Sequence, residues 1–475
     1  MDNLRKFYID GEWVEPLQAR DLPVENPATG EQVATTVLGG AQDVERAITA
    51  ARNAFESFSQ TTREERLEMM ERLLACYMER YDEVAAAITM EMGAPISFSK
   101  AAQADTGRGH IQAAIDALRD FRFEEDTRNA KVVREPIGVC GFICPWNWPI
   151  NQIACKVAPA LAAGCTMVMK PSQVAPLSAY LFADICHQAG LPKGVFNMVN
   201  GSGAEVGHIL STHPEVDMVS VTGSTRVGAS VSKDAADSIK RVALELGGKS
   251  PHLILDDADM EKAVKWGVFN CFENSGQSCN APTRMLVPQS RYEEALEIAQ
   301  RIAAKVQVGD PTQEGRHIGP MASQNQYDTT QKYIQIGIDE GARLLCGGLG
   351  KPEGFEVGHY ARPTIFADVR NDMTIAQEEI FGPVLSIIPY GDEEEGIAIA
   401  NDTIYGLAGY VHGGDMERNR RVARRIKAGM IHINGAYQDY DAPFGGYKQS
   451  GNGREWGEYA LHDFLEIKAI NGYNG

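Results

Sequence analysis

One short stretch of the chain, residues 274–280, surrounds a single thiol with small and polar residues in the order Asn-Ser-Gly-Gln-Ser-Cys-Asn. The thiol belongs to Cys279. A structural cysteine usually has apolar neighbours, as Cys165 does ahead of residues 166–169. A nucleophilic thiolate instead needs polar, partly open surroundings. The stretch therefore indicates either a catalytic cysteine or an exposed loop that happens to contain one.

Polar side chains also follow two predicted strands. Asn147 lies among prolines and aromatic residues after the strand at 137–143. A rigid side-chain N–H there could stabilise an oxyanion, and a tight turn is the alternative. Lys170 ends the strand at 166–170 and suits a phosphate or a sugar hydroxyl. A solvated lysine is the alternative at that position.

Two further strand ends carry groups that strand packing does not require. Gly223 and Ser224 begin a helix after the strand at 218–222, and free amides at such an end bind phosphate. The spacing is not that of a glycine-rich dinucleotide motif. Glu245 lies in an apolar strand end, where desolvation should raise the pKa of its carboxyl and suit it to act as a general base. A salt bridge, for instance with Lys249, is the alternative.

The composition excludes several classes of function. The 475 residues include 64 acidic and 45 basic ones, for a net charge of −19, which argues against partners such as nucleic acid or an anionic membrane surface. The nine cysteines contain no Cys-x-x-Cys pair, and the ten histidines are scattered, so we expect neither a disulfide framework nor a metal site. The longest apolar run, residues 157–169, is shorter than the roughly 20 residues that span a bilayer. These features predict a cytoplasmic protein.

The elements that must position these residues alternate between strand and helix. Residues 7–13 read as a hairpin that turns at Asp10 and Gly11. Residues 41–118 have a helical pattern in which Thr62 begins a capped helix, and strands at 137–143, 166–170, 196–199 and 218–222 alternate with helices up to residue 247. Nearly continuous apolar strands indicate a parallel, doubly wound sheet, which binds ligands at its carboxyl edge. A second set of elements follows from residue 248 to residue 448. The predicted fold class is therefore α/β with two doubly wound domains.

Two segments read as exposed β structure. Residues 119–136 form a charged, alternating hairpin arm with a turn at 126–129, and residues 462–470 alternate like an edge strand that needs a partner. An isolated two-stranded arm is marginal in water, so we expect it to pack on another subunit.

The motifs occur in an order that is typical of one enzyme superfamily. Asn147, Lys170, the Gly-Ser-Thr turn at 223–225, Glu-Leu-Gly-Gly-Lys at 245–249 and Gly-Gln-Ser-Cys ending at Cys279 are followed by matching segments at 377–384 and 443–451. Over essentially its full length the chain resembles the NAD(P)-dependent aldehyde dehydrogenase superfamily, of the hydrolytic, non-acylating type. The resemblance implies a dinucleotide-binding domain at 1–118 and 137–247, a catalytic domain at 248–448, and an oligomerisation arm and strand at 119–136 and 459–475.

The resemblance also implies a reaction. Cys279 would attack the aldehyde carbon, and Asn147 with the backbone N–H of Cys279 would hold the oxyanion. After hydride transfer to the nicotinamide, Glu245 would activate the water that hydrolyses the thioester. Members that form acyl-CoA generally lack this glutamate, so a free carboxylate is the expected product.

Further residues receive roles by the same carry-over. Those that would bind NAD, or NADP as a second candidate, are Trp146, Lys170, Gln173, Gly223, Ser224, Gly247, Glu379 and Phe381. Those assigned to the substrate pocket or to a proton relay are Cys155, Phe444 and Glu455. Homodimers or homotetramers are implied as well.

Two positions depart from common family patterns. Gln173 stands where many NAD-preferring members have glutamate, and the missing charge would admit the 2′-phosphate of NADP. Cys155 stands where several members have a large aromatic residue, which suggests a roomy, mostly apolar channel. Medium or long aliphatic aldehydes or ω-oxo acids are the expected substrates.

Three alternatives remain at this point. A semialdehyde dehydrogenase for a small charged substrate would need a cation near the mouth, with Arg108 and Arg284 as candidates. A thiol esterase would use Cys279 and Glu245 without a redox step and would leave the phosphate turn unexplained. A catalytically silent structural protein would not need either residue.

Overall fold

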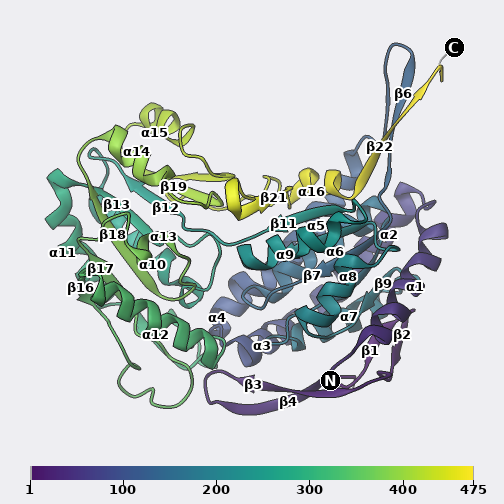
Figure 1. Cartoon of the computed structure of the whole chain (residues 1–475), viewed down its shortest axis with the longest axis horizontal. Coiled ribbons are helices and arrows are strands. Elements are labelled where there is room, and N and C mark those ends of the chain that lie inside the picture. The colour runs from purple at the N-terminus through teal and green to yellow at the C-terminus, as the bar shows by residue number, and fades with distance from the viewer. Residues whose placement is uncertain (1–2, 474–475) are drawn as a thin grey trace.

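The first of the two large sheets is built on five parallel strands at its centre. The computed structural model describes residues 3–473, and Figure 1 shows this sheet among the purple and teal helices. The parallel strands are β7 (Val139–Ile143), β8 (Thr166–Lys170), β9 (Phe196–Met198), β10 (Met218–Thr222) and β11 (Arg241–Glu245). Their apolar residues are buried on both faces, as the near-continuous hydrophobic runs predict.

Both edges of this sheet are antiparallel. At one edge β1 (Phe7–Ile9) pairs with β9 and with β2 (Glu12–Val14). Asp10 and Gly11 form the connecting turn with φ of 56° and 75°, the positive values that two-residue hairpins prefer. At the other edge β21 (Gly451–Asn452) pairs with β11, so the chain returns here after building the second sheet.

The segment at 41–118 is largely helical, as its pattern predicts. Thr62 caps its helix as predicted, because its hydroxyl accepts from the N–H of Glu65 while the Glu65 carboxylate accepts from the N–H of Thr62. The helices around this sheet are α1 (Ala41–Phe58), α2 (Arg63–Glu79), α3 (Tyr81–Met92), α4 (Ile96–Phe98), α5 (Ala104–Asp120), α6 (Pro149–Ala163), α7 (Leu177–Gln188), α8 (His208–Thr212) and α9 (Thr225–Ala236), with π-helical turns at Ser99–Gln103 and Gly203–Gly207.

The second large sheet lies at the other end of the molecule in Figure 1. Its order is β16 (Arg343–Cys346), β17 (Thr364–Ala367), β18 (Val384–Tyr390), β13 (Arg284–Pro288), β12 (Pro251–Ile254), β19 (Ala408–His412) and β20 (Met430–Ile433), parallel except for β16. Its helices are α10 (Met260–Phe272), α11 (Tyr292–Ala303), α12 (Gln324–Asp339), α13 (Thr374–Gln377), α14 (Glu393–Asn401) and α15 (Met416–Ala423). The two sheets confirm the α/β class.

The predicted hairpin arm projects from the molecule (Figure 1). It consists of β5 (Glu124–Asp126) and β6 (Ala130–Pro136), and β22 (Leu465–Asn471) lies along β6. The tail strand begins later than predicted, because residues 462 and 463 belong to α16 (Gly457–Asp463), whose Ala460 and Leu461 are buried. Residues 1, 2, 474 and 475 of the predicted segments lie outside the described residues.

The remaining strands connect parts of the surface. A long hairpin joins β3 (Arg20–Asn26) to β4 (Glu31–Leu38), and β14 (Gln307–Val308) pairs with β15 (His317–Ile318). No helix of residues 3–473 is long and apolar enough to cross a membrane.

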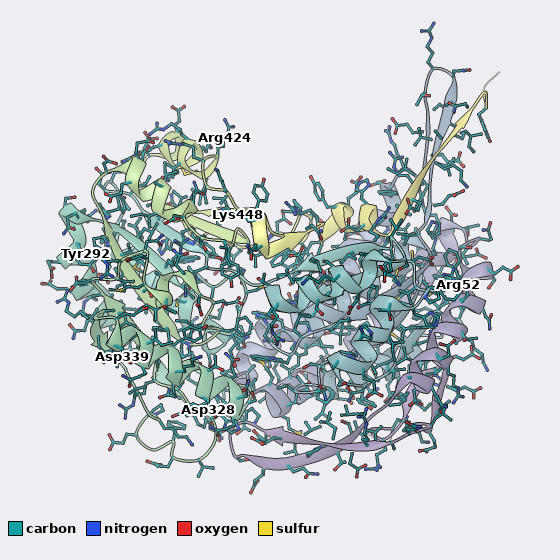
Figure 2. All side chains as sticks on the ribbon, viewed as in Figure 1. Arg52, Tyr292, Asp328, Asp339, Arg424 and Lys448 are labelled. Atoms are coloured by element: carbon teal, nitrogen blue, oxygen red, sulfur yellow. The ribbon has the colours of Figure 1, made fainter. Side chains whose placement is uncertain are left out.

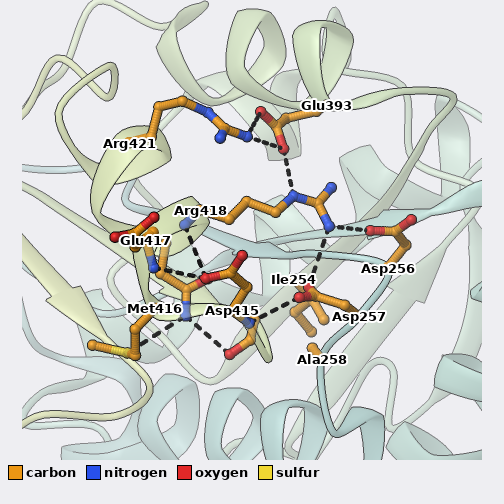
Figure 3. A network of polar contacts seen from close by, with 12 residues as sticks. Ile254, Asp256, Asp257, Ala258, Glu393, Asp415, Met416, Glu417, Arg418 and Arg421 are labelled. Atoms are coloured by element: carbon orange, nitrogen blue, oxygen red, sulfur yellow. Dashed lines mark hydrogen bonds and ion pairs between the residues drawn. The ribbon is translucent and has the colours of Figure 1, made fainter.

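Charged side chains fasten helices to strand ends. On α1, Arg52 pairs with Asp217 just before β10, at 2.6 Å. Figure 2 labels Arg52 among the side chains of the molecule. Near the second sheet, Arg418 on α15 contacts Asp256, Asp257 and Glu393, at 2.5, 3.3 and 2.6 Å (Figure 3). This cluster joins α14 and α15 to the end of β12.

Candidate active site

A cavity of about 240 Å³ lies at the carboxyl ends of β7, β10 and β11. Ligands bind at this edge of parallel α/β sheets. The second sheet's portion of the chain supplies the opposite wall. The lining residues are Pro145, Trp146, Asn147, Thr222, Gly223, Ser224, Glu245, Leu246, Gly247, Cys279, Gln326, Glu379 and Phe381. The cavity thus brings together most of the site residues expected from the sequence.

The backbone before Cys279 has an unusual conformation. Asn274, Ser275 and Gly276 follow α10 with φ of 53°, 57° and 73°, three consecutive residues in the left-handed region. Gly276 has no alternative there, because a Cβ on it would lie 2.1 Å from the carbonyl oxygen of Gly382. Such conformations persist only where surrounding contacts hold them.

Those contacts come from buried polar side chains. Asn274, Ser275 and Gln277 are all buried, whereas the sequence suggested a stretch with nothing suited to packing. Hydrogen bonds explain the difference, since burial costs little once a polar group is paired. The Gln277 side chain donates to the carbonyl of Asn274 at 3.0 Å and accepts from the N–H of Ala322 at 2.9 Å. The stretch before the thiol is therefore a fixed element and not an exposed loop.

Asn147 is tied to the same backbone. Its Nδ2 donates to the carbonyl of Gln277 at 3.1 Å, and the Asn274 side chain donates to that carbonyl at the same distance. Asn274 also donates to the carbonyl of Asn147 at 3.0 Å. An amide nitrogen carries two hydrogens, and the contact with Gln277 uses one of them. Asn147 is buried in the cavity wall and held two residues from the thiol.

Cys279 itself is half-buried. Burial raises the pKa of its thiol well above the ordinary value, and the carboxylates of Glu379 and Glu245 raise it further. The backbone N–H of Cys279 hydrogen-bonds to its own thiol, and no other residue among 3–473 accepts from it. The thiol is thus a neutral group at rest, next to an amide that is available to a ligand.

Glu245 is a carboxyl held without a partner. It is buried at the end of β11, and neither of its oxygens has a hydrogen-bond partner among the described residues. Burial raises the pKa of this carboxyl well above its usual range, with a further contribution from the Glu455 carboxylate. The alternative salt bridge with Lys249 does not form, since the ammonium of Lys249 has no partner in the described part of the chain either.

A buried ion pair next to this carboxyl was not expected from the sequence. The ammonium of Lys156 on α6 pairs with Glu455 and donates to the hydroxyl of Thr222 at 2.8 Å. Burial alone would lower the pKa of Lys156, but the Glu455 carboxylate raises it. Thr222 pairs in register with Glu245, so the ion pair and the carboxyl share one end of the sheet. The signal in the sequence is the single charged residue, Lys156, of a helix whose side chains are all buried.

The turn at Gly223 and Ser224, which the sequence suggested for phosphate binding, ends in an ordinary helix cap. The Ser224 hydroxyl accepts from the N–H of Val227 at 3.4 Å, at the start of α9. The N–H of Gly223 donates to the carbonyl of Glu245 at 3.0 Å, so this amide is used within the sheet. Gly223 and Ser224 both line the cavity.

Glu379 faces the turn after β11. Its carboxylate accepts from the N–H of Gly248 at 3.0 Å, and burial raises the pKa of this carboxyl to about 7. A Cβ on Gly247 would lie 2.2 Å from the other carboxylate oxygen, so a side chain there would displace the Glu379 carboxylate. Phe381 lies edge-on to Trp146, with ring centroids 5.4 Å apart.

Lys170 and Gln173 do not line this cavity. The ammonium of Lys170 is buried and donates to the carbonyls of Pro171 and Gly201, at 2.7 and 3.2 Å. Burial lowers the pKa of Lys170 to about 8. Gln173 is half-buried three residues further on.

The residues expected in the substrate pocket are divided between two places. Phe444 stacks on Trp456 at 4.7 Å, and Cys279 packs against the same apolar cluster. Cys155 lies inside α6, where its thiol donates to Glu455 at 3.3 Å.

The two arginines considered as partners for a charged substrate lie in different surroundings. Arg108 pairs with Asp105 at 2.7 Å and is partly exposed on α5. Arg284 is fully buried at the start of β13, and its guanidinium donates to the carbonyls of Lys249, Ile399 and Ala400. Arg284 is therefore unable to receive a substrate carboxylate. The described residues also contain no cluster of side chains that could hold a metal ion.

Comparison with known proteins finds sequence relatives over nearly the whole chain. The sequence model of the aldehyde dehydrogenase family matches residues 13–470. A 3-succinoylsemialdehyde-pyridine dehydrogenase from Pseudomonas sp. is 56% identical, with both chains fully covered. A putative aldehyde dehydrogenase from Staphylococcus saprophyticus is 50% identical, again over both full lengths.

Solved structures agree with these sequence matches. A mutant of aldehyde dehydrogenase C from Pseudomonas syringae, in complex with NAD+ and octanal, superposes with a TM-score of 0.98 at 51% identity, covering 99% of this chain and 97% of that one. An aldehyde dehydrogenase from Mycobacterium tuberculosis, in complex with NAD+, gives a TM-score of 0.96 at 40% identity, with 98% and 97% coverage.

Proposed function

The chain belongs to the aldehyde dehydrogenase family, and from this premise we propose that it oxidises an aldehyde to the carboxylic acid with NAD as cofactor. The observation that carries the proposal is the meeting of a thiol, an unpaired buried carboxyl and an anchored amide in one cavity: Cys279, Glu245 and Asn147. We assign cofactor binding to residues 1–118 and 137–247, and catalysis to residues 248–448.

The residues around the cavity fit a dinucleotide. Gly247 leaves free the space that a side chain would fill beside Glu379, and one oxygen of Glu379 remains for a ribose hydroxyl. Ser224 and the N-terminus of α9 suit a pyrophosphate. Trp146 and Phe381 supply flat apolar walls. Bound NAD supplies the hydride acceptor for the oxidation.

The first step is addition of the thiol to the carbonyl carbon. Because the resting thiol is neutral, its proton must leave as the C–S bond forms, and water that reaches the half-buried thiol can accept it. The aldehyde oxygen becomes an oxyanion. Asn147 Nδ2 and the backbone N–H of Cys279 are the donors that stabilise it.

After oxidation the substrate carbon is a thioester on Cys279. Its hydrolysis requires a base that removes a proton from water, and a desolvated carboxylate is a stronger base than an exposed one. Glu245 fits this task, and the Lys156–Glu455 pair beside it can pass the proton onward. The products are the free acid and the regenerated thiol.

The favoured substrates are medium or long aliphatic aldehydes or ω-oxo acids. The apolar cluster of Phe444 and Trp456 beside Cys279 supports an apolar acyl chain, and the octanal complex of the Pseudomonas syringae relative supports it independently. A semialdehyde with a polar far end is the second candidate. It is favoured by the 56% identity to the pyridine semialdehyde enzyme, and Arg108 is the partly exposed cation that could face such a group.

A spectrophotometric screen tests the proposal. Purified protein is incubated with NAD and a panel that runs from butanal to decanal and includes succinic semialdehyde, and NADH absorbance is recorded. We expect the highest kcat/KM for the longer apolar aldehydes. A panel without NADH formation would reject the oxidation, and hydrolysis of an activated ester unaffected by NAD would favour the thiol esterase.

The arm supports self-association. Strand β22 leaves Ile467 and Ile470 exposed on an element that projects from the molecule. We propose a homodimer or homotetramer that covers this arm, and light scattering after size exclusion measures the assembly.

A further inference from the structure

Behind the nucleophile loop, a buried tyrosine holds the residue that follows Cys279. Tyr410 lies in the middle of β19, 5% exposed, and its hydroxyl donates to the carbonyl of Asn280 at 2.7 Å. Neither residue belongs to the cavity lining described above. The contact joins the second sheet directly to the backbone that carries the thiol.

Neighbouring rings fix the side chain of Tyr410. His432 stacks on it with centroids 4.9 Å apart and planes 20° apart, and Trp266 lies 5.0 Å away on another side. Cys279 packs against the apolar cluster that includes Tyr410. Because the ring is packed on several sides, the position of its hydroxyl is fixed, and so is the direction of its hydrogen bond to Asn280.

The backbone on the other side of the thiol is also anchored. Asn147 and Asn274 both donate to the carbonyl of Gln277, at 3.1 Å. The thiol and the N–H of Cys279 therefore lie between an anchor at residue 277 and an anchor at residue 280. A small displacement of a reacting group costs large factors in rate, so both anchors matter for catalysis.

We propose that Tyr410 is a positioning residue for the nucleophile: by holding the carbonyl of Asn280, its hydroxyl fixes the direction of the Cys279 thiol and backbone N–H. The proposal rests on the proposed function, in which Cys279 is the nucleophile. It assigns no direct contact between Tyr410 and the substrate. The hydroxyl contributes through orientation, and the ring contributes packing.

A matched pair of substitutions tests this role. Tyr410→Phe removes the hydroxyl and keeps the ring. The control is Tyr390→Phe, because Tyr390 is 4% exposed on β18 and its hydroxyl also donates to a backbone carbonyl, that of Ile254, at 2.7 Å. Each variant loses one buried hydrogen bond of the same kind, so both should lower the unfolding midpoint to a similar extent.

The two variants should differ in chemistry. In single-turnover experiments at saturating NAD and octanal, Tyr410→Phe should slow NADH formation roughly tenfold to a hundredfold, with the KM for NAD unchanged. It should also slow alkylation of Cys279 by iodoacetamide. Tyr390→Phe should match the wild type in both. Equal rates for the two variants would overturn the positioning role, while turnover in Cys279→Ala would instead refute the proposed function.

Discussion

Gly248 lies directly against the backbone carbonyl of Cys279: a methyl group on Gly248 would be 2.4 Å from that oxygen. The neighbouring N–H of the same glycine donates to Glu379 at 3.0 Å. The turn after β11 therefore contacts both the proposed nucleophile and an acid proposed to bind the cofactor. The close approach to the Cys279 carbonyl leaves no room for a larger residue at position 248.

Gly248→Ala should displace the Cys279 backbone, because a carbonyl cannot rotate away as a flexible side chain can. We expect kcat/KM to fall on the order of a hundredfold. The matched control is Gly203→Ala, where an added methyl group meets nothing within 4 Å. A Gly248→Ala enzyme as active as that control would show that the thiol tolerates displacement.

Glu245→Gln should separate the two halves of the reaction. The amide cannot act as a base, so thioester hydrolysis should slow by about 10²- to 10⁴-fold. Another proton acceptor, such as water, can still serve the first half. Stopped-flow absorbance should then show a burst of about one NADH per active site followed by slow turnover. Loss of the burst together with turnover would place Glu245 in the first half, and unchanged turnover would remove it from the mechanism.

Lys156→Met should strongly destabilise the protein, because it leaves the Glu455 carboxylate buried without its cation. Breaking such a pair from one side costs about 3–5 kcal/mol of the free energy of unfolding. The double variant Lys156→Met/Glu455→Leu should recover much of that loss. Urea denaturation measures both. Equal stability of the single variant and the wild type would mean that the pair adds nothing to the fold.

The Arg418 cluster predicts a loss of stability in acid (Figure 3). Hydrogen bonding to Arg418 lowers the pKa of Asp256, and although burial alone would raise the pKa of Glu393, Arg418 and Arg421 hold it below its usual range. Groups with a lowered folded-state pKa stabilise the protein above their ordinary pKa, and this contribution disappears as the pH falls through the lowered value.

Arg418→Met should therefore reduce the unfolding midpoint at pH 7, and the difference from the wild type should shrink as the pH falls below about 4. Thermal melts from pH 7 to pH 3 measure it. A difference that stays constant with pH would assign the effect to packing of the Arg418 side chain.

The residue at position 173 should influence the choice between NAD and NADP. Without a carboxylate at this position, NADP should support measurable turnover alongside NAD, and Gln173→Glu should suppress the NADP reaction while leaving the NAD reaction nearly unchanged. The comparison is kcat/KM for each cofactor in both proteins. Absence of NADP turnover in the wild type, with no effect of the substitution, would contradict the prediction.

The sequence predicts well those features that are encoded locally. The four strands from 137 to 222, the capped helix at Thr62 and the turn at Asp10 and Gly11 all appear as expected. Asn147 and Glu245 meet in the cavity because polar residues at the carboxyl ends of parallel strands converge. Cys279 reaches the same cavity from the turn that follows α10.

Contacts between residues far apart in the chain cannot be predicted from local sequence patterns. Lys156 and Glu455 are 299 residues apart, and nothing near either one indicates the other. The burial of Asn274 and Gln277 depends on backbone partners that only the folded chain supplies. Arg284 looked available to a charged substrate, but carbonyls around β13 enclose it. Residues 462 and 463 alternate like a strand, yet burial of Ala460 and Leu461 extends a helix through them.

The proposed reaction depends on Cys279 as the covalent nucleophile of an aldehyde oxidation. The most direct measurement is the NADH formed from octanal and NAD by Cys279→Ala, compared with Cys346→Ala, a change at another half-buried cysteine. We predict no NADH above background for Cys279→Ala and wild-type rates for Cys346→Ala, with both proteins folded by circular dichroism. Substantial turnover by Cys279→Ala would show that Cys279 is not the nucleophile.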